Sequence, residues 1–578
     1  MSHKWTCKVI FYLLLLTPVL GYADAVPPRP SISDVRNAIP SSVNAGVIGN
    51  ILQGSVVPKF SRKPSAIQQQ APPPKPAEAA EAKILFKLMN VTFQGNTVFS
   101  SQELRQIFQP FINQTISLLK LRDLVGDVTK KYRDAGYILS RALLPPQTIK
   151  GGSVKIQIVE GFINQVTVKG DPGIARSLIQ SYGNDIAKMK PLQFRQLERD
   201  MLLINDLPGI TTKAVITPSK NVPGAADLAL LVDRRKVSAY ASYDNYGTRY
   251  LGPQEFGAGA NFNSLMFPGD SLGLRLVTVA QTNQMQFYEI DEMVPIGANG
   301  TKLSLGGNYS QTKPGFNLDD LEVIGRSQAL YADLSHPVIR SRSKDILLHA
   351  GLNYQNVSST ILGVPFYADR IRSLIIGGKW DGIDSWRGYN NFGLDTEHGF
   401  QILAANYKPL NQSRPKGLPN FTKISANISR LQGLGTRFSL LGAVKGQYSF
   451  NPLLAVEQFA YGGPDFGRGY DPAEIIGDDG LAGKLELRMD TAPGYRLLQL
   501  VQYYVFYDGG VVWNRDSINL LGRQDAFSAG FGARFTFMSN LTGNFFLAKP
   551  LTMPVATTEQ MGQNGNRFRA FFQIVANI

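Results

Sequence analysis

The chain has 578 residues, a formal net charge of +15 at pH 7 and a single cysteine. Its basic residues are spread through strand-like segments and form no basic arm or helix, which argues against nucleic acid as a partner. The one cysteine, Cys7, precedes an apolar N-terminal run. A mature chain without that run has no disulfide and no thiolate metal site.

Residues 1–25 predict a secretory signal peptide. A basic start is followed by an apolar run from Val9 to Leu20, and Ala23-Asp24-Ala25 offers the small-x-small site of signal peptidase. The run is shorter than the roughly 20 residues that cross a bilayer as a helix. We expect cleavage after Ala25, and no later apolar stretch is long enough for a spanning helix.

Residues 26–60 predict a short helix, and residues 61–83 predict a linker. Apolar residues at helical spacing run from Val47 to Leu52, with Ser42 as a candidate cap. The linker is rich in Pro, Gln and Ala, including Gln68 to Pro76, and cannot bury a core. We therefore expect a tethered helix that does not pack into the next domain.

Residues 84–161 and 162–236 each predict the order strand, helix, helix, strand, strand. In the first repeat, Ser100 and Glu103 form a capping-box pattern. The second helix of this repeat carries one apolar stripe that ends at Tyr132. The expected strands of the two repeats are Leu85–Phe93, Ile138–Leu144, Val154–Glu160, Ile163–Lys169, Thr212–Thr217 and Ala226–Asp233, and the expected helices of the second are Ile174–Tyr182 and Leu192–Asn205.

From residue 237 to 578 the pattern becomes strict alternation. Glu486, Arg488 and Asp490, for example, alternate with apolar neighbours. A soluble sandwich would not place three charged residues on one buried face, whereas a barrel with lipid outside and water inside does. The 56 glycines, 32 phenylalanines and 23 tyrosines fit such a barrel. The length allows an even strand number near 16, with strands of roughly 10 residues.

Enzyme motifs are missing from the sequence. Outside the signal, the histidines His336, His349 and His398 stand isolated, with no His-Glu-x-x-His spacing. There is no Gly-x-Ser-x-Gly elbow and no phosphate-binding loop. We expect no catalytic residue, no metal and no cofactor.

Two short motifs in the barrel region carry the candidate site. Gly467-Arg468-Gly469-Tyr470 lies in a glycine-rich loop that can bend tightly and approach a wall closely, where Tyr470 can stack. Phe506, Asp508 and Gly510 share one face of a strand. If that face is the lumen, an Arg468–Asp508 ion pair forms. The alternative is a solvated loop arginine and a turn aspartate.

The chain combines both motifs with alternating strands and an export signal. In this combination it resembles the two-partner secretion translocators (TpsB proteins), a branch of the outer-membrane insertase superfamily. Lys131–Tyr137, Pro145–Gln147 and Val159–Gly161 resemble the translocator form of the POTRA domain. The resemblance implies an N-terminal plug helix and linker, two POTRA (β-α-α-β-β) domains, and a C-terminal transmembrane antiparallel β-barrel of 16 strands. It also implies that loop 457–480 folds into the barrel at residues 237–578 and pairs with its wall.

The resemblance further implies the function. The protein would lie in the outer membrane of a Gram-negative cell, inserted into lipid by the barrel assembly machinery, with its POTRA domains in the periplasm. These domains would capture a large, unfolded, β-rich exoprotein by β-augmentation. The plug would leave the pore during transport, and folding of the partner outside would supply the energy.

Two other functions stay open at this point. A barrel insertase is the first, although such relatives usually have three or five POTRA domains and this chain has room for two. A passive porin is the second, but it leaves the repeats unexplained. The partner can be a haemolysin, an adhesin, a haem-scavenging protein or a toxin.

Overall fold

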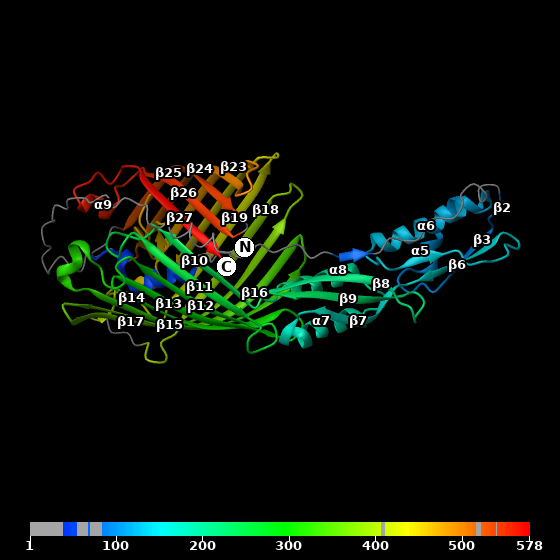
Figure 1. Cartoon of the computed structure of the whole chain (residues 1–578), viewed down its shortest axis with the longest axis horizontal. Helices are drawn as coiled ribbons and strands as arrows, with labels where there is room; N and C mark the ends of the chain where they lie inside the picture. Colours follow the sequence, from blue (N-terminus) through cyan, green and yellow to red (C-terminus); the bar gives the residue numbers. More distant parts are fainter. Residues whose placement is uncertain (1–38, 55–66, 70–83, 406–410, 516–521, 539) are drawn as a thin grey trace, which may run out of the picture.

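The computed structural model describes residues 39–54, 67–69, 84–405, 411–515, 522–538 and 540–578. The molecule is elongated, with a barrel at one end and two small α/β repeats in a row at the other (Figure 1). The predicted signal peptide and most of the predicted linker lie outside the described residues. No described helix is both long and apolar enough to cross a membrane.

The first repeat folds around its second helix. The apolar stripe of that helix is buried from Leu121 to Tyr132, as the spacing predicts. The capping box is present: Glu103 N–H donates to Ser100 Oγ at 3.2 Å, and Ser100 N–H donates to the Glu103 carboxylate at 2.8 Å. The elements are β2 (Leu85–Lys87), β3 (Asn90–Gln94), α5 (Ser101–Arg105), η2 (Gln109–Phe111), β4 (Thr115–Ser117), α6 (Leu118–Asp134), β5 (Arg141–Leu143) and β6 (Ser153–Val159).

Two predicted strands of this repeat are shorter in the structure. The expected strand 85–93 is split at Leu88, because this side chain turns into the core and its N–H donates to Gln114 O at 2.9 Å. The split gives two sheets, β3-β6-β5 and β2-β4. The expected strand 138–144 pairs with β6 only over Arg141–Leu143.

Glu160 holds the first repeat together at the end of β6. Its carboxylate accepts hydrogen bonds from Thr97 N–H at 2.7 Å, Val98 N–H at 2.9 Å and Tyr132 O–H at 2.8 Å. Burial by itself would raise the pKa of Glu160, but these donors lower it below its usual value. The Val159-Glu160-Gly161 motif thus ties α6 to the turn before α5.

The second repeat contains an unpredicted strand from the linker. Its sheet order is β1-β8-β9-β7, where β1 (Ile67–Gln69) runs parallel to β8 with Ile67 opposite Ala214. The linker therefore covers one edge of this sheet, which composition alone did not predict. The other elements are β7 (Phe162–Gly170), η3 (Gly173–Ala175), α7 (Arg176–Lys188), α8 (Phe194–Asn205), β8 (Ile210–Pro218) and β9 (Ala225–Arg234).

Asp200 on α8 makes the second repeat sensitive to pH. Its carboxylate is 2% exposed, and burial raises its pKa to about 6, against hydrogen bonds from Gln196 at 3.2 and 3.3 Å. A carboxyl whose pKa is higher folded than unfolded stabilises the fold at low pH, and this stability is lost as pH rises through 6. Asp200→Asn is therefore expected to stabilise the repeat by about 2 kcal/mol at neutral pH and not below about pH 4.

Hydrogen-exchange protection of the α8 amides in the full chain, variant against parent at each pH, measures this effect. Asp171→Asn in the same repeat is the control, because Asp171 is 61% exposed and is not among the charges that act on Asp200. Equal protection of Asp200→Asn and parent at pH 7.5 contradicts the prediction.

Residues 237–578 form a closed antiparallel barrel of 16 strands within the described part of the chain, in which β27 pairs with β10. The strands are β10 (Val237–Asp244), β11 (Glu255–Asn263), β12 (Ser271–Val279), β13 (Met285–Ile296), β14 (Thr301–Thr312), β15 (Ile324–Arg340), β16 (Lys344–Ile361), β17 (Val364–Ile383), β18 (Tyr389–Gly399), β19 (Thr422–Leu434), β20 (Phe438–Ser449), β23 (Asp479–Thr491), β24 (Leu498–Trp513), β25 (Arg523–Phe537), β26 (Leu541–Pro550) and β27 (Arg569–Asn577).

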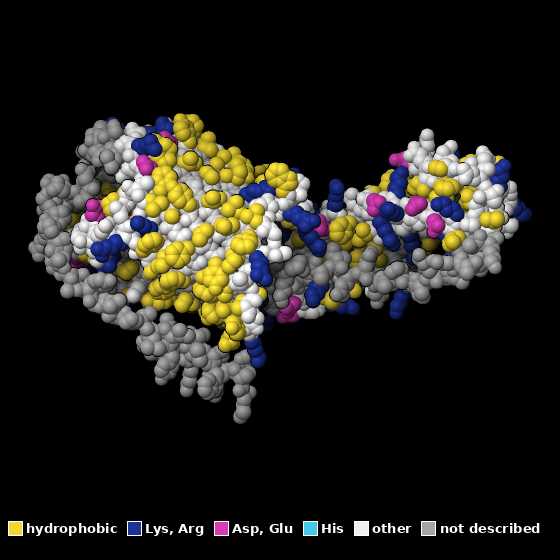
Figure 2. All heavy atoms as spheres, turned by 90° about the horizontal axis from the view of Figure 1, so that it is seen from above, with side chains coloured by type: hydrophobic (Ala, Val, Ile, Leu, Met, Phe, Trp, Pro, Cys, Tyr) yellow, Lys and Arg dark blue, Asp and Glu magenta, His cyan; other side chains and the backbone are white. Residues whose placement is uncertain are grey.

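Alternation separates the two faces of the wall. On β23, Leu485 and Leu487 point outward and are 52% and 40% exposed, while Glu486 between them points inward and is buried. Hydrophobic side chains cover most of the face of the barrel that Figure 2 shows. The predicted lipid-facing and lumen-facing faces are therefore present.

The N-terminal helix α3 (Ala45–Gly54) lies inside the barrel, after the turn η1 (Ser41–Val43). Ser310 and Thr312 on β14 donate to the carbonyls of Ala45 and Val43 at 2.6 and 2.8 Å, and Arg275 on β12 donates to Leu52 O at 2.6 Å. The helix has no charged side chain. These backbone hydrogen bonds act together with side-chain hydrogen bonds of Asn50 and Gln53 and with the packing of Ile48 and Leu52 in a buried apolar cluster on the wall.

The cap of this helix differs from the prediction. Asn44, not Ser42, accepts from Gly46 N–H at 2.9 Å and from Val47 N–H at 3.3 Å. Asn44 directly precedes the first helical residue, which is the position whose side chain reaches these amides. Ser42 lies within η1 and is buried.

Candidate functional site: an arginine loop on the inner barrel wall

The loop between β20 and β23 folds onto the inside of the barrel. It contains η6 (Ala455–Glu457) and a small hairpin of β21 (Phe459–Tyr461) with β22 (Ile475–Gly477). Phe459, Tyr461, Tyr470 and Ile475 form one buried cluster with Val512 and Ala526 of the wall. The segment 457–480 is thus packed against β24 and β25.

The structure brings Arg468 and Asp508 together. Arg468 Nε and Nη2 donate to the two Asp508 oxygens at 2.9 and 2.7 Å, and the Arg468 backbone N–H donates at 3.0 Å. Arg468 is 5% exposed and Asp508 0%. The guanidinium carbon also lies 3.6 Å from the centroid of the Phe506 ring. A bidentate pair stacked on an aromatic ring fixes the arginine in one geometry.

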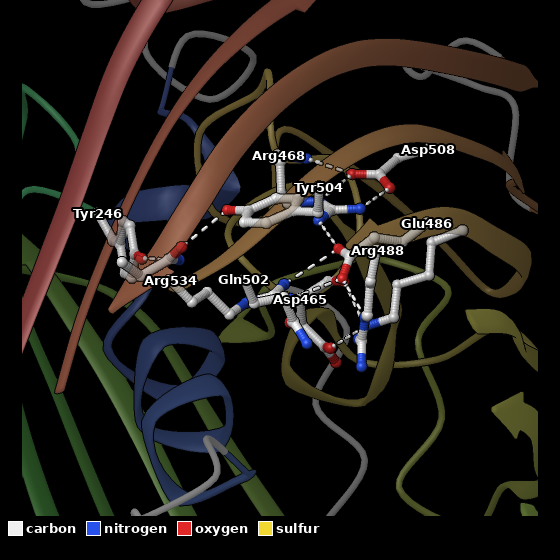
Figure 3. Close-up of polar contacts among 11 residues, drawn as sticks. Tyr246, Asp465, Arg468, Glu486, Arg488, Gln502, Tyr504, Asp508 and Arg534 are labelled. Carbon is white, nitrogen blue, oxygen red and sulfur yellow. Dashed lines mark hydrogen bonds and ion pairs between the residues drawn. The ribbon is translucent and has the colours of Figure 1, made fainter. Parts of the chain in front are cut away.

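A second carboxylate, which neither short motif contains, completes the site. Glu486 on β23 accepts from Arg468 Nη1, from Arg488 Nε at 2.6 Å and from Arg534 Nη1 at 2.7 Å (Figure 3). Three guanidinium groups therefore surround the carboxylates of Glu486 and Asp508. Glu486 and Arg488 stood in the alternating charged pattern of β23, which was the available signal. Arg534 comes from β25, and no sequence spacing relates it to Arg468.

The glycines and Tyr470 let the loop approach the wall closely. Gly467 has a φ of +89°, which favours glycine. A Cβ on Gly469 would lie 2.8 Å from Ser528 Cβ. Tyr470 is buried, and its hydroxyl donates to Phe527 O at 2.9 Å. Tyr470 thus adds a polar contact to the aromatic packing that the sequence predicted.

Gly510 leaves room for Tyr461 of the loop. A Cβ at this position would lie 2.3 Å from the Tyr461 ring. Gly510→Ala is therefore expected to lift the hairpin off β24 and to expose loop 457–480 to added protease. Gly483→Ala on the neighbouring strand is the matched control, since its nearest atom would lie 3.8 Å away. Equal proteolysis of the two variants in folded barrels contradicts this prediction.

A further buried ion pair joins this loop to the segment before β19. Both terminal nitrogens of Arg414 donate to Asp478, which is 0% exposed. Asp478 also accepts from Leu453 N–H and Arg515 N–H, each at 2.8 Å. Arg414 and Asp478 are 64 residues apart, and no motif or spacing relates them. The loop is thus anchored at its base as well as at Arg468.

The histidine expected to be isolated at position 349 has two acidic neighbours. Its Nδ1 lies 3.1 Å from an Asp333 oxygen, and its Nε2 lies 2.9 Å from an Asp395 oxygen. Gly377, on the strand between, makes room for this contact, because a Cβ there would lie 2.0 Å from Asp395. Among the described residues, no group of three His, Cys, Asp or Glu side chains is arranged to hold a metal ion.

Comparisons with known proteins agree with this architecture. The sequence model described as haemolysin secretion/activation protein ShlB/FhaC/HecB matches residues 224–535, and that of the ShlB-type POTRA domain matches residues 86–161. The heme/hemopexin transporter protein HuxB of Haemophilus influenzae strain 86-028NP is 27% identical over 510 residues, covering 86% of this chain and 89% of that protein.

Two solved structures share the fold. CdiB from Escherichia coli superposes with a TM-score of 0.70 at 19% identity, covering 88% of this chain and 93% of that chain. BamA from Haemophilus ducreyi, lacking POTRA domains 1–3, gives 0.50 at 14% identity, covering 85% of this chain and 100% of that chain. The chain belongs to the haemolysin secretion/activation protein family ShlB/FhaC/HecB, and it is an outer-membrane transporter of two-partner secretion whose POTRA domains lie in the periplasm.

Proposed function

We propose that the transporter captures one large, unfolded, β-rich exoprotein at its POTRA domains and passes it through the barrel after α3 has left. We assign residues 84–161 and 162–236 to the two POTRA domains and 237–578 to the barrel. The observation that carries the proposal is the way α3 sits in the lumen. It carries no charged side chain. The wall holds it by hydrogen bonds to its backbone and to the Asn50 and Gln53 side chains, which water can replace, and by apolar packing of Ile48 and Leu52.

The linker supports a coupling between capture and opening. Its strand β1 covers the β8 edge of the second repeat through main-chain pairing, the same kind of contact that an added partner strand would make. A partner strand at this edge displaces β1. Displacement frees the linker that leads back to α3, so capture favours release of the plug.

The arginine loop has a structural role in this scheme. The Arg468, Asp508 and Glu486 contacts hold loop 457–480 on the β23–β25 wall, which leaves the opposite side of the lumen for the partner once α3 is out. We assign transport roles to Gly467, Arg468, Gly469 and Tyr470 in the loop and to Phe506, Asp508 and Gly510 in the wall.

We also infer that the chain catalyses no reaction and needs no cofactor. The energy for transport comes from folding of the exoprotein outside the cell. The apolar outer wall lies in lipid, and the barrel assembly machinery inserts it. The name of HuxB makes a haem-scavenging protein the first partner class to assay, with haemolysins, adhesins and contact-dependent toxins next.

The test compares cells with and without this transporter. The extracellular amount of the large exported protein encoded beside the gene is measured together with the levels of other outer-membrane barrels. Loss of that one protein with other barrels unchanged is the expected result. A general fall in barrels would instead mean a barrel insertase.

A further inference from the structure

The turn between β11 and β12 exposes three consecutive large apolar side chains. Leu265, Met266 and Phe267 are 54%, 56% and 49% exposed. The turn lies at the end of the barrel where β10 leaves the second repeat, which is the periplasmic end. An apolar triplet at this position needs an apolar environment to cover it.

The turn is rigid. The carboxylate of Asp270, 0% exposed, accepts the backbone N–H groups of Leu265, Met266 and Phe267 at 2.7, 2.8 and 2.6 Å. Ser264 N–H donates to Asp270 O at 2.8 Å and closes the turn. The N–H groups of residues 264–267 are thus satisfied inside the turn, and the three apolar side chains are the part that projects.

The neighbours of Asp270 place the turn on the lipid side of the wall. On β13, Tyr288 and Ile290 point outward and are 46% and 53% exposed. Glu292, two residues further on the same face, has its carboxyl beside that of Asp270, and both of its carboxyl oxygens are shielded from solvent. The turn therefore folds over the outward face of β13, next to the lipid-facing Leu272 and Leu305 that pair with Glu292.

The same turn is fastened to the POTRA–barrel junction. Asn263 N–H donates to Lys236 O at 2.8 Å, and its side-chain amide donates to Arg235 O at 3.0 Å. Residues 234–236 are Arg-Arg-Lys, and Lys and Arg side chains gather at this junction (Figure 2). Basic residues beside apolar ones are typical of a phospholipid interface.

We propose that this turn is a membrane foot: Leu265, Met266 and Phe267 enter the periplasmic leaflet of the outer membrane. The occupant is the phospholipid leaflet, because the triplet continues the lipid-facing belt of β12 to β14 and lies beside a basic run. Through Asn263 and the junction strand, the foot fixes the tilt of the second POTRA domain beneath the pore. This inference does not depend on secretion.

Tryptophan fluorescence tests the proposal in the full-length protein. The four tryptophans of the chain are replaced by phenylalanine, and Phe267→Trp and, separately, Met266→Trp are introduced. The proteins are reconstituted into phosphatidylethanolamine–phosphatidylglycerol vesicles with and without lipids brominated near the headgroup. The matched control is Ser343→Trp, at an exposed position of the β15–β16 turn at the same end of the barrel.

Brominated lipid is expected to quench the fluorescence of Met266→Trp and Phe267→Trp about twofold more than that of Ser343→Trp. Iodide in the buffer is expected to quench Ser343→Trp more than the two foot variants. Asp270→Ala in the Phe267→Trp background removes the acceptor of three N–H groups and is expected to weaken quenching by lipid. Quenching by iodide and not by lipid at both positions would overturn the proposal and make the triplet a protein-docking surface. Equal lipid quenching at Ser343 would also overturn it, because the whole rim would then be immersed.

Discussion

Arg468→Ala is expected to reduce export of the partner at least about tenfold while the barrel still assembles. The substitution leaves Asp508, which is fully buried, without its bidentate partner and removes one of the three arginines around Glu486. Removing one member of a buried ion pair costs about 3 kcal/mol or more, because the remaining charge stays in a desolvated site. The loop then leaves the wall and obstructs the lumen. Asp508→Ala is expected to act in the same direction.

Export is measured as extracellular partner per unit of folded, heat-modifiable barrel. Lys484→Ala is the matched control, because Lys484 lies on the same strand as Glu486 and pairs with Asp465 of the same loop at 2.8 Å. Asp465 is 78% exposed, so this pair contributes little. Normal export from both Arg468→Ala and Asp508→Ala, at normal barrel levels, would refute the role of the pair.

Locking α3 to the wall is expected to stop export completely. A Cβ on Gly49 of α3 would lie 3.7 Å from Ser310 Cβ on β14, within the roughly 3.5–4.5 Å that a disulfide requires. The double variant Gly49→Cys/Ser310→Cys can therefore form this bond without moving the helix. The chain's own cysteine, Cys7, lies in the predicted signal peptide and offers no competing thiol in the mature protein.

Export is compared for the double variant with and without a reductant that enters the periplasm, and for each single variant as a control. Export is expected to return on reduction and to stay near normal in both single variants. Full export from the oxidised double variant would mean that the partner passes while α3 remains in place. Release of α3 would then not be a step of export.

The pattern of side chains along the chain predicted the parts that depend on near neighbours. Strand alternation predicted the barrel, because inward and outward residues differ by one position. Helical spacing predicted the stripe of α6, and the glycines around Arg468 predicted a loop able to approach a wall. The sequence placed Gly510 on one strand face with Phe506 and Asp508. Why this position needs a glycine is visible only in the fold, because the space is taken by the ring of Tyr461, 49 positions away.

Contacts between distant strands could not be predicted in the same way. Glu486 meets both Arg468 and Arg534 only because β23, β24 and β25 are neighbours in a closed sheet, in which the long Arg534 side chain reaches Glu486 across β24. His349 meets Asp395 across β17 for the same reason. The pairing of β1 with β8 involves main-chain groups, which every residue carries, so the composition of the linker gave no sign of it.

The amino-acid sequence by itself determined the order of the parts and the two faces of the barrel wall, since both follow from spacing, and it offered Arg468 and Asp508 as a candidate pair. Only the tertiary structure decided that Arg468 also pairs with Glu486, that α3 hydrogen-bonds to β12 and β14, and that the β11–β12 turn folds outward over Glu292. Those features depend on the register and closure of the sheet. A sheet brings residues hundreds of positions apart into contact through backbone pairing that side-chain patterns do not specify.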